Sequence, residues 1–176
     1  YPPRCPLCQC MLETEGSRIC SWCRPKLPYI REPLCKKCGK PLHKEEQEYC
    51  LQCEEGNHLF ICGRSVFRYE KAFRKSVQRM KFHNHREYLD FYAEEMAETG
   101  AFWLERWKIR TVIPVPLHIR KRRQRGFDQT GIMAEKFCSL TGAHLDHCSV
   151  KRIRHTRPQK ELKREERRTN LKGAFA

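Results

Sequence analysis

The part of the chain after residue 60 alternates between strand-like and helix-like patterns of apolar and polar residues. Residues 61–69 alternate as in a β-strand, whereas the apolar residues within 70–82 recur at helical spacing with basic residues between them. A second helical pattern begins near Glu87, and we expect that helix to end at Gly100. The alternation predicts a domain that mixes strands with helices.

A further strand, helix and strand are predicted in residues 111–150. Residues 111–116 form a short apolar run that is rich in β-branched residues and ends in proline, which is typical of a buried strand. Asp128 is placed to cap the next helix, Gly142 follows its last turn, and residues 144–150 predict another strand. A strand–helix–strand order implies a parallel sheet with helices on its faces, so the predicted fold class is α/β.

The first 60 residues show neither period and instead repeat pairs of cysteines. Four C-x-x-C pairs begin 15 residues apart: Cys5/Cys8, Cys20/Cys23, Cys35/Cys38 and Cys50/Cys53. Two such turns supply four thiolates to one ion, which is the tetrahedral donor set that suits Zn²⁺. The segment has few large apolar side chains, so bound metal is the expected source of its stability. We predict a double zinc ribbon in residues 1–55 that holds two structural zinc ions.

Alternatives to this zinc assignment remain open from spacing alone. A disulfide scaffold needs an oxidising compartment, whereas repeated C-x-x-C pairs are typical of intracellular metal sites. The equal intervals favour sequential pairing of the turns, but an interleaved cross-brace has the same spacing. His43 and His58 are alternative ligands. The cysteines outside the pairs are expected to be ordinary small hydrophobic residues: Cys10, Cys62, Cys138 and Cys148.

Charge and length narrow the classes of protein to consider. The chain has 176 residues, with 36 Lys and Arg against 21 Asp and Glu, a formal net charge of +15. No stretch approaches the roughly 20 apolar residues of a membrane span, which excludes an integral membrane protein. Residues 108–176 carry 18 basic and 6 acidic residues, a net charge of +12. This asymmetry indicates a polyanionic partner, either a nucleic acid or a phosphorylated small molecule.

The densest run of cations lies in residues 114–129, between the predicted strand and the next helix. Ligands of open parallel sheets bind beyond the C-terminal ends of the strands, and a helix N-terminus favours an anion. Gly126 permits a close backbone turn there. We therefore expect a basic loop that binds phosphate or pyrophosphate, the alternative being a solvated basic loop. Four of its cations are assigned to nucleic-acid binding: Arg120, Lys121, Arg122 and Arg123.

Several motifs combine with the cysteine pairs into one recognisable set. They are Met80-Lys81-Phe82 at the end of the first predicted helix, IPVP at 113–116, RGFDQ at 125–129, and spaced polar residues within 156–175. The set resembles the ComF family over nearly the whole chain. In that family a cysteine-rich zinc ribbon precedes a type I phosphoribosyltransferase domain, which the resemblance places in residues 61–176. Asp128 departs from the family, which usually has Asn there, and puts a carboxylate near the predicted anion site.

The resemblance also implies roles for particular residues. The pyrophosphate loop and the start of the next helix are expected to bind the ligand through Pro116, Leu117, His118, Arg125, Gly126, Phe127, Asp128 and Gln129. A mobile loop within about 151–172 is expected to close over the site with Arg157, Gln159, Arg167 and Asn170. The loop that holds ribose and 5-phosphate in this family is not found in residues 1–176. We therefore expect the chain to be a C-terminally incomplete fragment.

Three functions of different classes follow. The first is a Mg²⁺-dependent transferase that uses phosphoribosyl diphosphate, for which we assign no catalytic residue. The second is binding of single-stranded DNA during DNA uptake, the role that the resemblance implies in natural competence. The third is docking of the ribbons on a partner such as the DNA-translocating ATPase of the competence machinery. We expect a cytoplasmic protein that reaches the inner face of the membrane only through partners.

Overall fold

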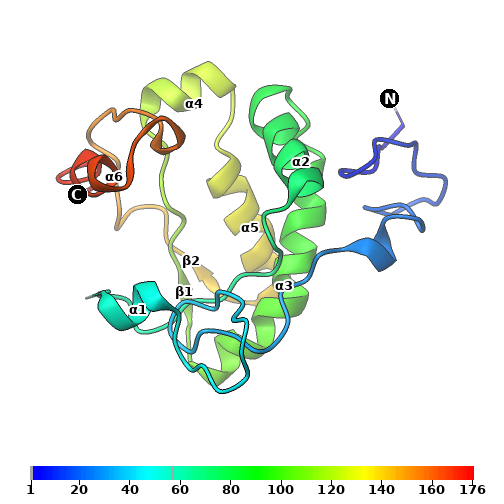
Figure 1. Ribbon diagram of the computed structural model, residues 1–176. Helices are drawn as coiled ribbons and strands as arrows, with labels where there is room; N and C mark the ends of the chain where they lie inside the picture. Colours follow the sequence, from blue (N-terminus) through cyan, green and yellow to red (C-terminus); the bar gives the residue numbers. More distant parts are fainter. Residues whose placement is uncertain (1, 57) are drawn as a thin grey trace. The chain divides into compact units, whose positions relative to one another are not determined.

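The computed structural model describes residues 2–56 and 58–176, which belong to two compact units (Figure 1). The first unit ends at Ser76 and the second comprises Val77–Ala176. The division falls inside helix α2, Lys71–Phe82, which agrees with the predicted helix. None of the helices in the described part of the chain has the length and apolar composition that crossing a bilayer requires.

The first unit contains two copies of one loop-rich arrangement. Each copy begins with an antiparallel bridge, Arg4↔Met11 in the first and Leu34↔Pro41 in the second. Apart from the start of α2, the helices in the unit's described residues are the 3₁₀ helix η1, Arg24–Lys26, and the short helix α1, Leu51–Glu55. Cysteines occupy much of the buried space that apolar side chains fill in larger folds, and the buried ones are Cys5, Cys23, Cys35 and Cys50.

The strand predicted over 61–69 is wrong. This segment forms only one antiparallel bridge, between Tyr29 and Phe67, with a backbone hydrogen bond of 2.8 Å from Arg68 to Pro28. Pro28 has no backbone N–H and therefore cannot donate to a continuing ladder. The pairing stops on the Pro28 side of the bridge for that reason.

The second unit is organised around the long helix α3, Tyr88–Arg106. The prediction that this helix ends at Gly100 is wrong, because the helix continues for six residues beyond it. A Cβ atom at Gly100 would lie 3.1 Å from Cε2 of Phe137, a side chain of helix α5, Gln129–Thr141. Glycine at this position lets α3 and α5 approach closely and does not terminate the helix.

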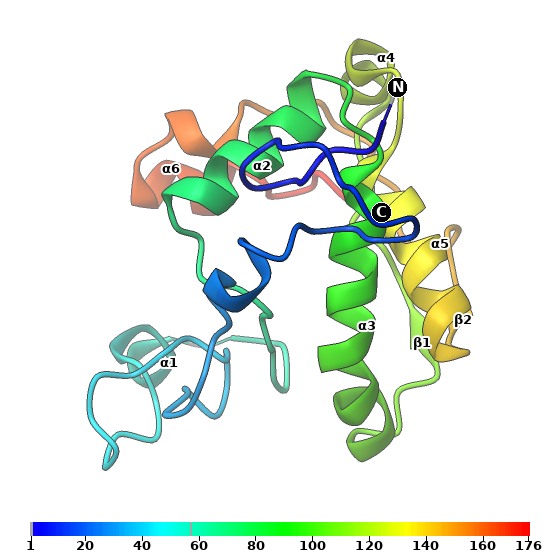
Figure 2. The same cartoon turned by 90° about the vertical axis from the view of Figure 1, so that its right-hand side faces the viewer.

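A two-stranded parallel sheet packs beside this helix pair, as both views show (Figures 1 and 2). Strand β1, Thr111–Val112, pairs with strand β2, His144–Leu145, with α5 between them in the chain. Both strands are shorter than predicted, and Pro114 and Pro116 remove donors that a longer β1 would need. The parallel pair with its connecting helix confirms the α/β fold class.

The core of the second unit lies between α3, α5 and this sheet. Ala97, Phe137 and Cys138 are buried together. Five partly buried apolar residues pack against them: Met96, Leu104, Val112, Ala143 and Leu145. Cys138 is therefore a small core residue, as expected, whereas Cys148 is exposed. The core holds the segments on either side of α5 in fixed positions.

Within the second unit, the last 26 residues begin and end at a pair of hydrogen-bonded segments. Arg152 and Phe175 form an antiparallel bridge, and Lys151 and Ala176 exchange backbone hydrogen bonds of 2.7 and 2.9 Å. Residues 154–173 between these pairs, here named the arm, contain the 3₁₀ helix η2, Gln159–Glu161, and helix α6, Arg164–Asn170. The two ends of the arm therefore lie side by side, and its mobility stays a prediction.

Candidate metal centres and anion site

The second ribbon brings its four paired cysteines together. The Sγ atoms of Cys35, Cys38, Cys50 and Cys53 all lie within 4.8 Å of one another. This is the sequential arrangement of C-x-x-C turns and not the interleaved one. Within the described residues neither metal-ligand cluster includes His43 or His58.

Local backbone geometry explains how the second cluster forms. Gly39 takes a φ of +68° directly after Cys38, and its N–H donates to the Cys35 carbonyl at 2.9 Å, which closes the first turn. Burial raises the pKa of the Cys35 thiol, but backbone N–H groups of Cys38, Cys50 and Lys37 outweigh it and lower that pKa to about 6. Burial raises the pKa values of the neighbouring Cys38 and Cys53 thiols, so metal binding at this cluster must release their protons.

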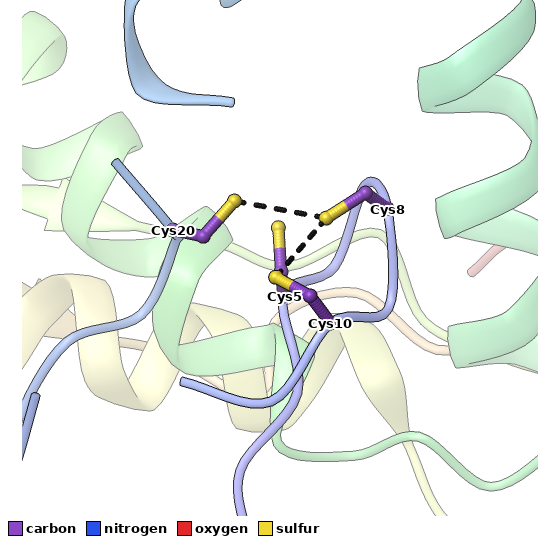
Figure 3. A group of neighbouring side chains, drawn as sticks. All are labelled: Cys5, Cys8, Cys10 and Cys20. Carbon is purple, nitrogen blue, oxygen red and sulfur yellow. Dashed lines mark hydrogen bonds between the residues drawn. The ribbon is translucent and has the colours of Figure 1, made fainter. Parts of the chain in front are cut away.

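The first ribbon gathers one more cysteine than its sequence pairs supply. The Sγ atoms of Cys5, Cys8, Cys10 and Cys20 lie within 4.8 Å of one another (Figure 3). Cys23, which is buried, also neighbours the thiols of Cys20, Cys8 and Cys5. The expectation that Cys10 is an ordinary hydrophobic residue is wrong, because its side chain is exposed and lies against the other thiols. In the sequence Cys10 is the last cysteine of a C-x-x-C-x-C pattern, but this spacing alone does not specify that it joins the metal site.

The donor set and its dimensions fit zinc. Tetrahedral ZnS₄ with bonds of about 2.3 Å has sulfur–sulfur edges of about 3.8 Å. The Sγ atoms of Cys8 and Cys20 are 3.6 Å apart, and those of Cys38 and Cys50 are 3.7 Å apart. Two four-cysteine clusters thus fit structural zinc, and four thiolates leave no position for a reacting water.

The basic segment 114–129 forms a helix where the sequence predicted a loop. Helix α4, Ile119–Arg125, begins after His118, whose Nδ1 accepts a hydrogen bond from the Arg120 N–H at 3.2 Å. It ends at Gly126, which has a φ of +77°. The four cations assigned to nucleic acid lie on this helix, and three are exposed while Lys121 is half-buried: Arg120, Lys121, Arg122 and Arg123.

A side chain of the protein itself, Asp128, caps the N-terminus of α5. Asp128 accepts hydrogen bonds at Oδ1 from the Gly131 N–H at 3.2 Å and the Thr130 hydroxyl at 3.0 Å. The expectation that this helix presents free N–H groups to an anion is therefore wrong at Gly131. The carboxylate that departs from the family pattern is a helix cap, a role that Asn also fills.

Cations from three separate segments of the second unit, one of them α4, lie close together. Burial, and then the positive charge of Arg125, lowers the pKa of Lys81. Burial also lowers the pKa of Lys121, followed by repulsion from Arg152 and Arg125. Lys81 belongs to the Met80-Lys81-Phe82 motif noted above, and Arg152 was not singled out. The sequence did not indicate that the two would meet, because 71 residues separate them in the chain. Together Lys81, Lys121, Arg125 and Arg152 are named the cation cluster.

Aromatic rings and an open hollow adjoin the cation cluster. The guanidinium of Arg125 lies 5.3 Å from the ring centroid of Phe82, and that of Arg86 lies 4.7 Å from Phe127. A hollow of about 690 Å³ opens beside α4. Its lining includes Pro116, Arg122, Gly126, Phe127, Asp128 and Arg152.

The predicted mobile-loop residues are brought together inside the arm. Arg167 donates from Nε to the carbonyls of Gln159 and Leu162, each at 3.0 Å. Asn170 donates from Nδ2 to the carbonyl of Arg157 at 3.0 Å. Both side chains therefore brace the backbone of the arm.

The arm reaches the start of α4 through two histidines. The rings of His118 and His155 lie 5.2 Å apart with their planes at 68°. Burial, followed by the charges of His155, Arg120 and Arg152, lowers the pKa of His118. The start of the arm and the beginning of α4 thus form one electropositive site.

Comparisons with known proteins agree with the metal clusters. Residues 1–54 match the family model described as a double zinc ribbon domain. The chain is 27% identical to competence protein F of Haemophilus influenzae over 98% of this chain and 76% of that protein. It is also 27% identical to competence protein ComFC of Bacillus subtilis, over 67% of this chain and 50% of that protein. The DNA utilization protein YhgH of Salmonella typhimurium is 27% identical over 99% of the chain and 77% of its own length. No solved structure matches.

Proposed function

The chain belongs to the ComF family, and on that premise we propose that it acts in DNA uptake and that its second unit binds phosphoribosyl diphosphate. Relatives named as competence and DNA utilization proteins support the first part. We further propose that residues 1–55 form the zinc-binding domain and residues 61–176 a phosphoribosyltransferase-like domain.

The observation that carries ligand binding is the cation cluster. Burial, followed by repulsion from neighbouring arginines, lowers the pKa values of Lys81 and Lys121. Their charges are therefore held there at a cost in free energy that a bound polyanion would remove. Lys121 and Arg125 are one helical turn apart on α4 and are both half-buried, so they face the same ligand. A diphosphate supplies the dense negative charge that this arrangement lacks.

Unpaired polar atoms support the same site. Among the described residues, buried side-chain atoms without a hydrogen-bond partner include Gln129 Oε1, Arg152 Nε and Gln159 Nε2. The family resemblance implies that Gln129 binds the ligand and that Gln159 belongs to the mobile loop that closes over it. Polar atoms buried without partners are costly, and a ligand with hydroxyl and phosphate groups would satisfy them. Mg²⁺ would accompany the diphosphate and neutralise part of its charge, and we assign no residue of the chain to hold it.

Calorimetric titration of the full-length protein with phosphoribosyl diphosphate and Mg²⁺ tests this proposal. Arg125→Ala should weaken binding at least about tenfold, since a charge-assisted contact contributes roughly 1.5–3 kcal/mol. Arg123→Ala, which removes an exposed cation of the same helix, is the matched control and should leave the affinity within about twofold. Equal affinities of wild type and Arg125→Ala, with unchanged melting temperatures, would refute the site.

A second candidate function is binding of single-stranded DNA by the exposed face of α4. Arg120, Arg122 and Arg123 are exposed there and present a strip of positive charge to a nucleic acid backbone. Replacing all three with Ala should weaken binding of an oligonucleotide and reduce the slope of log affinity against log salt concentration. Binding that does not depend on salt would contradict this function. Docking of the ribbons on a DNA-translocating ATPase stays a prediction.

A further inference from the structure

The two ribbons correspond residue by residue with an offset of 30. The N–H of Gln9 donates to the carbonyl of Cys5 at 2.9 Å, as that of Gly39 does to Cys35. Gln9 and Gly39 share a φ of +68°. The N–H of Leu12 donates to Pro3 at 2.9 Å, and that of Leu42 donates to Pro33 at 2.8 Å. A residue of one ribbon can therefore be compared directly with the residue at the equivalent position of the other ribbon.

The two metal sites differ at one corresponding pair, Cys10 and Lys40. The N–H of Cys5 donates to the Cys10 carbonyl at 2.9 Å, and that of Cys35 donates to the Lys40 carbonyl at 2.8 Å, so the two residues occupy equivalent backbone positions. Lys40 is exposed and offers no metal ligand. Cys10 places its Sγ 3.3 Å from that of Cys8.

The first ribbon consequently holds five thiols where four suffice for one ion. Among the described residues the four-cysteine cluster of this ribbon is Cys5, Cys8, Cys10 and Cys20, and Cys23 lies beside it. Cys10 lies within 4.8 Å of the other three sulfurs of the cluster, and buried Cys23 neighbours the same three thiols. Zinc has no geometric preference from its d-electrons that would select one thiolate over another of equal reach.

We propose that the first metal site has two alternative ligand sets, which share Cys5, Cys8 and Cys20 and take the fourth thiolate from either Cys23 or Cys10. The second site has one set, because Lys40 stands where the fifth thiol would be. The first site should therefore keep a four-thiolate zinc ion after loss of Cys23, whereas the second site should not survive loss of Cys53.

Matched single substitutions in the full-length protein test whether the first metal site has two alternative ligand sets. Zinc per chain is measured by mass spectrometry, and Co²⁺ substitution reports the number of thiolates through the charge-transfer absorption. Cys23→Ala should retain two metal ions, each with four thiolates. Cys53→Ala should weaken metal binding at the second site by about 100-fold or more. The double variant Cys10→Ala/Cys23→Ala should lose the first site as well.

A reciprocal exchange tests the same idea by gain of function. Lys40→Cys added to Cys53→Ala places a fifth-position thiol in the second ribbon and should restore its four-thiolate Co²⁺ spectrum. A first site that is lost in Cys23→Ala as completely as the second site is in Cys53→Ala would overturn the proposal, and so would no restoration by Lys40→Cys.

The wild-type protein supplies a measurement that needs no variant. Alkylation of Cys10, followed by peptide mass spectrometry, is compared before and after zinc is removed by a chelator. If Cys10 serves as a ligand, zinc should slow its alkylation at least severalfold, while exposed Cys148 should react at the same rate in both states. Alkylation of Cys10 at a rate independent of zinc would overturn the proposal.

Discussion

At the scale of single residues, one backbone position closes the first turn of each ribbon. Gln9 and Gly39 both have a φ of +68°, a conformation that costs an L-residue roughly 1–2 kcal/mol. The two positions differ in their surroundings, because a Cβ at Gly39 would lie 2.7 Å from the carbonyl oxygen of Gly63. Glycine is therefore required in the second ribbon for close approach as well as for conformation.

Gly39→Ala should destabilise the zinc-loaded protein more than Gly16→Ala does. Gly16 has a φ of +79°, and a Cβ atom there would meet nothing within 4 Å, so its substitution carries only the conformational cost. Overpacking against the Gly63 carbonyl should add about 1–3 kcal/mol at Gly39. Chemical denaturation of the two zinc-loaded variants measures the difference, and equal destabilisation would show that the carbonyl moves aside freely.

His118 should couple ligand binding to pH. Burial and neighbouring cations lower its pKa, so in the free protein it is mostly neutral at pH 7. A bound diphosphate favours the charged ring and raises that pKa, and binding should therefore take up protons and tighten as the pH falls toward about 6.

Calorimetry in two buffers of different ionisation enthalpy measures this proton uptake. His118→Asn keeps an acceptor at the N-cap of α4 and should lower the number of protons taken up, while the ionisation of the ligand itself is common to both proteins. The groups that face His118 are His155, Arg120, Arg152 and Lys121, and they are unchanged in the variant. Identical uptake by both proteins would exclude His118 as the titrating group.

At the scale of elements, the residue that caps the start of α5 also adds a negative charge to the basic segment 114–129. Helix α5 begins at a residue capped by Asp128 and ends before Gly142, which has a φ of +73°. Both boundaries follow from short-range rules and agree with the sequence prediction. Burial lowers the pKa of the Arg125 guanidinium, and the negative charge of the Asp128 cap beside it opposes that lowering.

Two substitutions of Asp128 should separate capping from charge. Asp128→Ala removes the acceptor for Gly131 and Thr130 and should cost about 1 kcal/mol of stability. Asp128→Asn keeps the cap, so its stability should stay within about 0.5 kcal/mol of wild type, and loss of the negative charge should tighten diphosphate binding severalfold. Thermal unfolding and calorimetric titration measure the two effects. Weaker binding by Asp128→Asn would mean that the carboxylate itself contacts the ligand through Mg²⁺.

At the scale of the whole molecule, the two units are stabilised by different means. The first unit has cysteine clusters where a core would be, whereas the second has an apolar core around Ala97, Phe137 and Cys138. Metal binding supplies folding free energy directly in ribbons that lack a core of their own.

Removal of zinc should therefore unfold one unit and spare the other. With excess chelator, backbone amides of residues 3–56 should lose protection from hydrogen exchange, while those of α3 and α5 should keep it. Addition of Zn²⁺ should restore protection in the ribbons. Loss of protection in α3 and α5 to the same extent as in the ribbons would show that the metal stabilises the whole chain.

Local sequence determined the ribbons and the helices with clear caps. The C-x-x-C turns, the helix over 71–82 and the helix after Asp128 each depend on contacts within a few residues, which a pattern of residue types can encode. The same short-range rules misplaced the end of α3 at Gly100, because they do not include the ring of Phe137 that the glycine accommodates.

Only the tertiary structure decided which distant residues meet. Lys81, Arg125 and Arg152 come from separate segments of the chain. Repulsion of Lys81 by Arg125 and of Lys121 by Arg152 exists only once the fold has brought those segments together. Cys10 joined the first cluster by the path of the turn after Cys8, which residue spacing does not specify. The sequence by itself determined the donors and the charges, and the fold decided their grouping, because grouping depends on contacts between residues far apart in the chain.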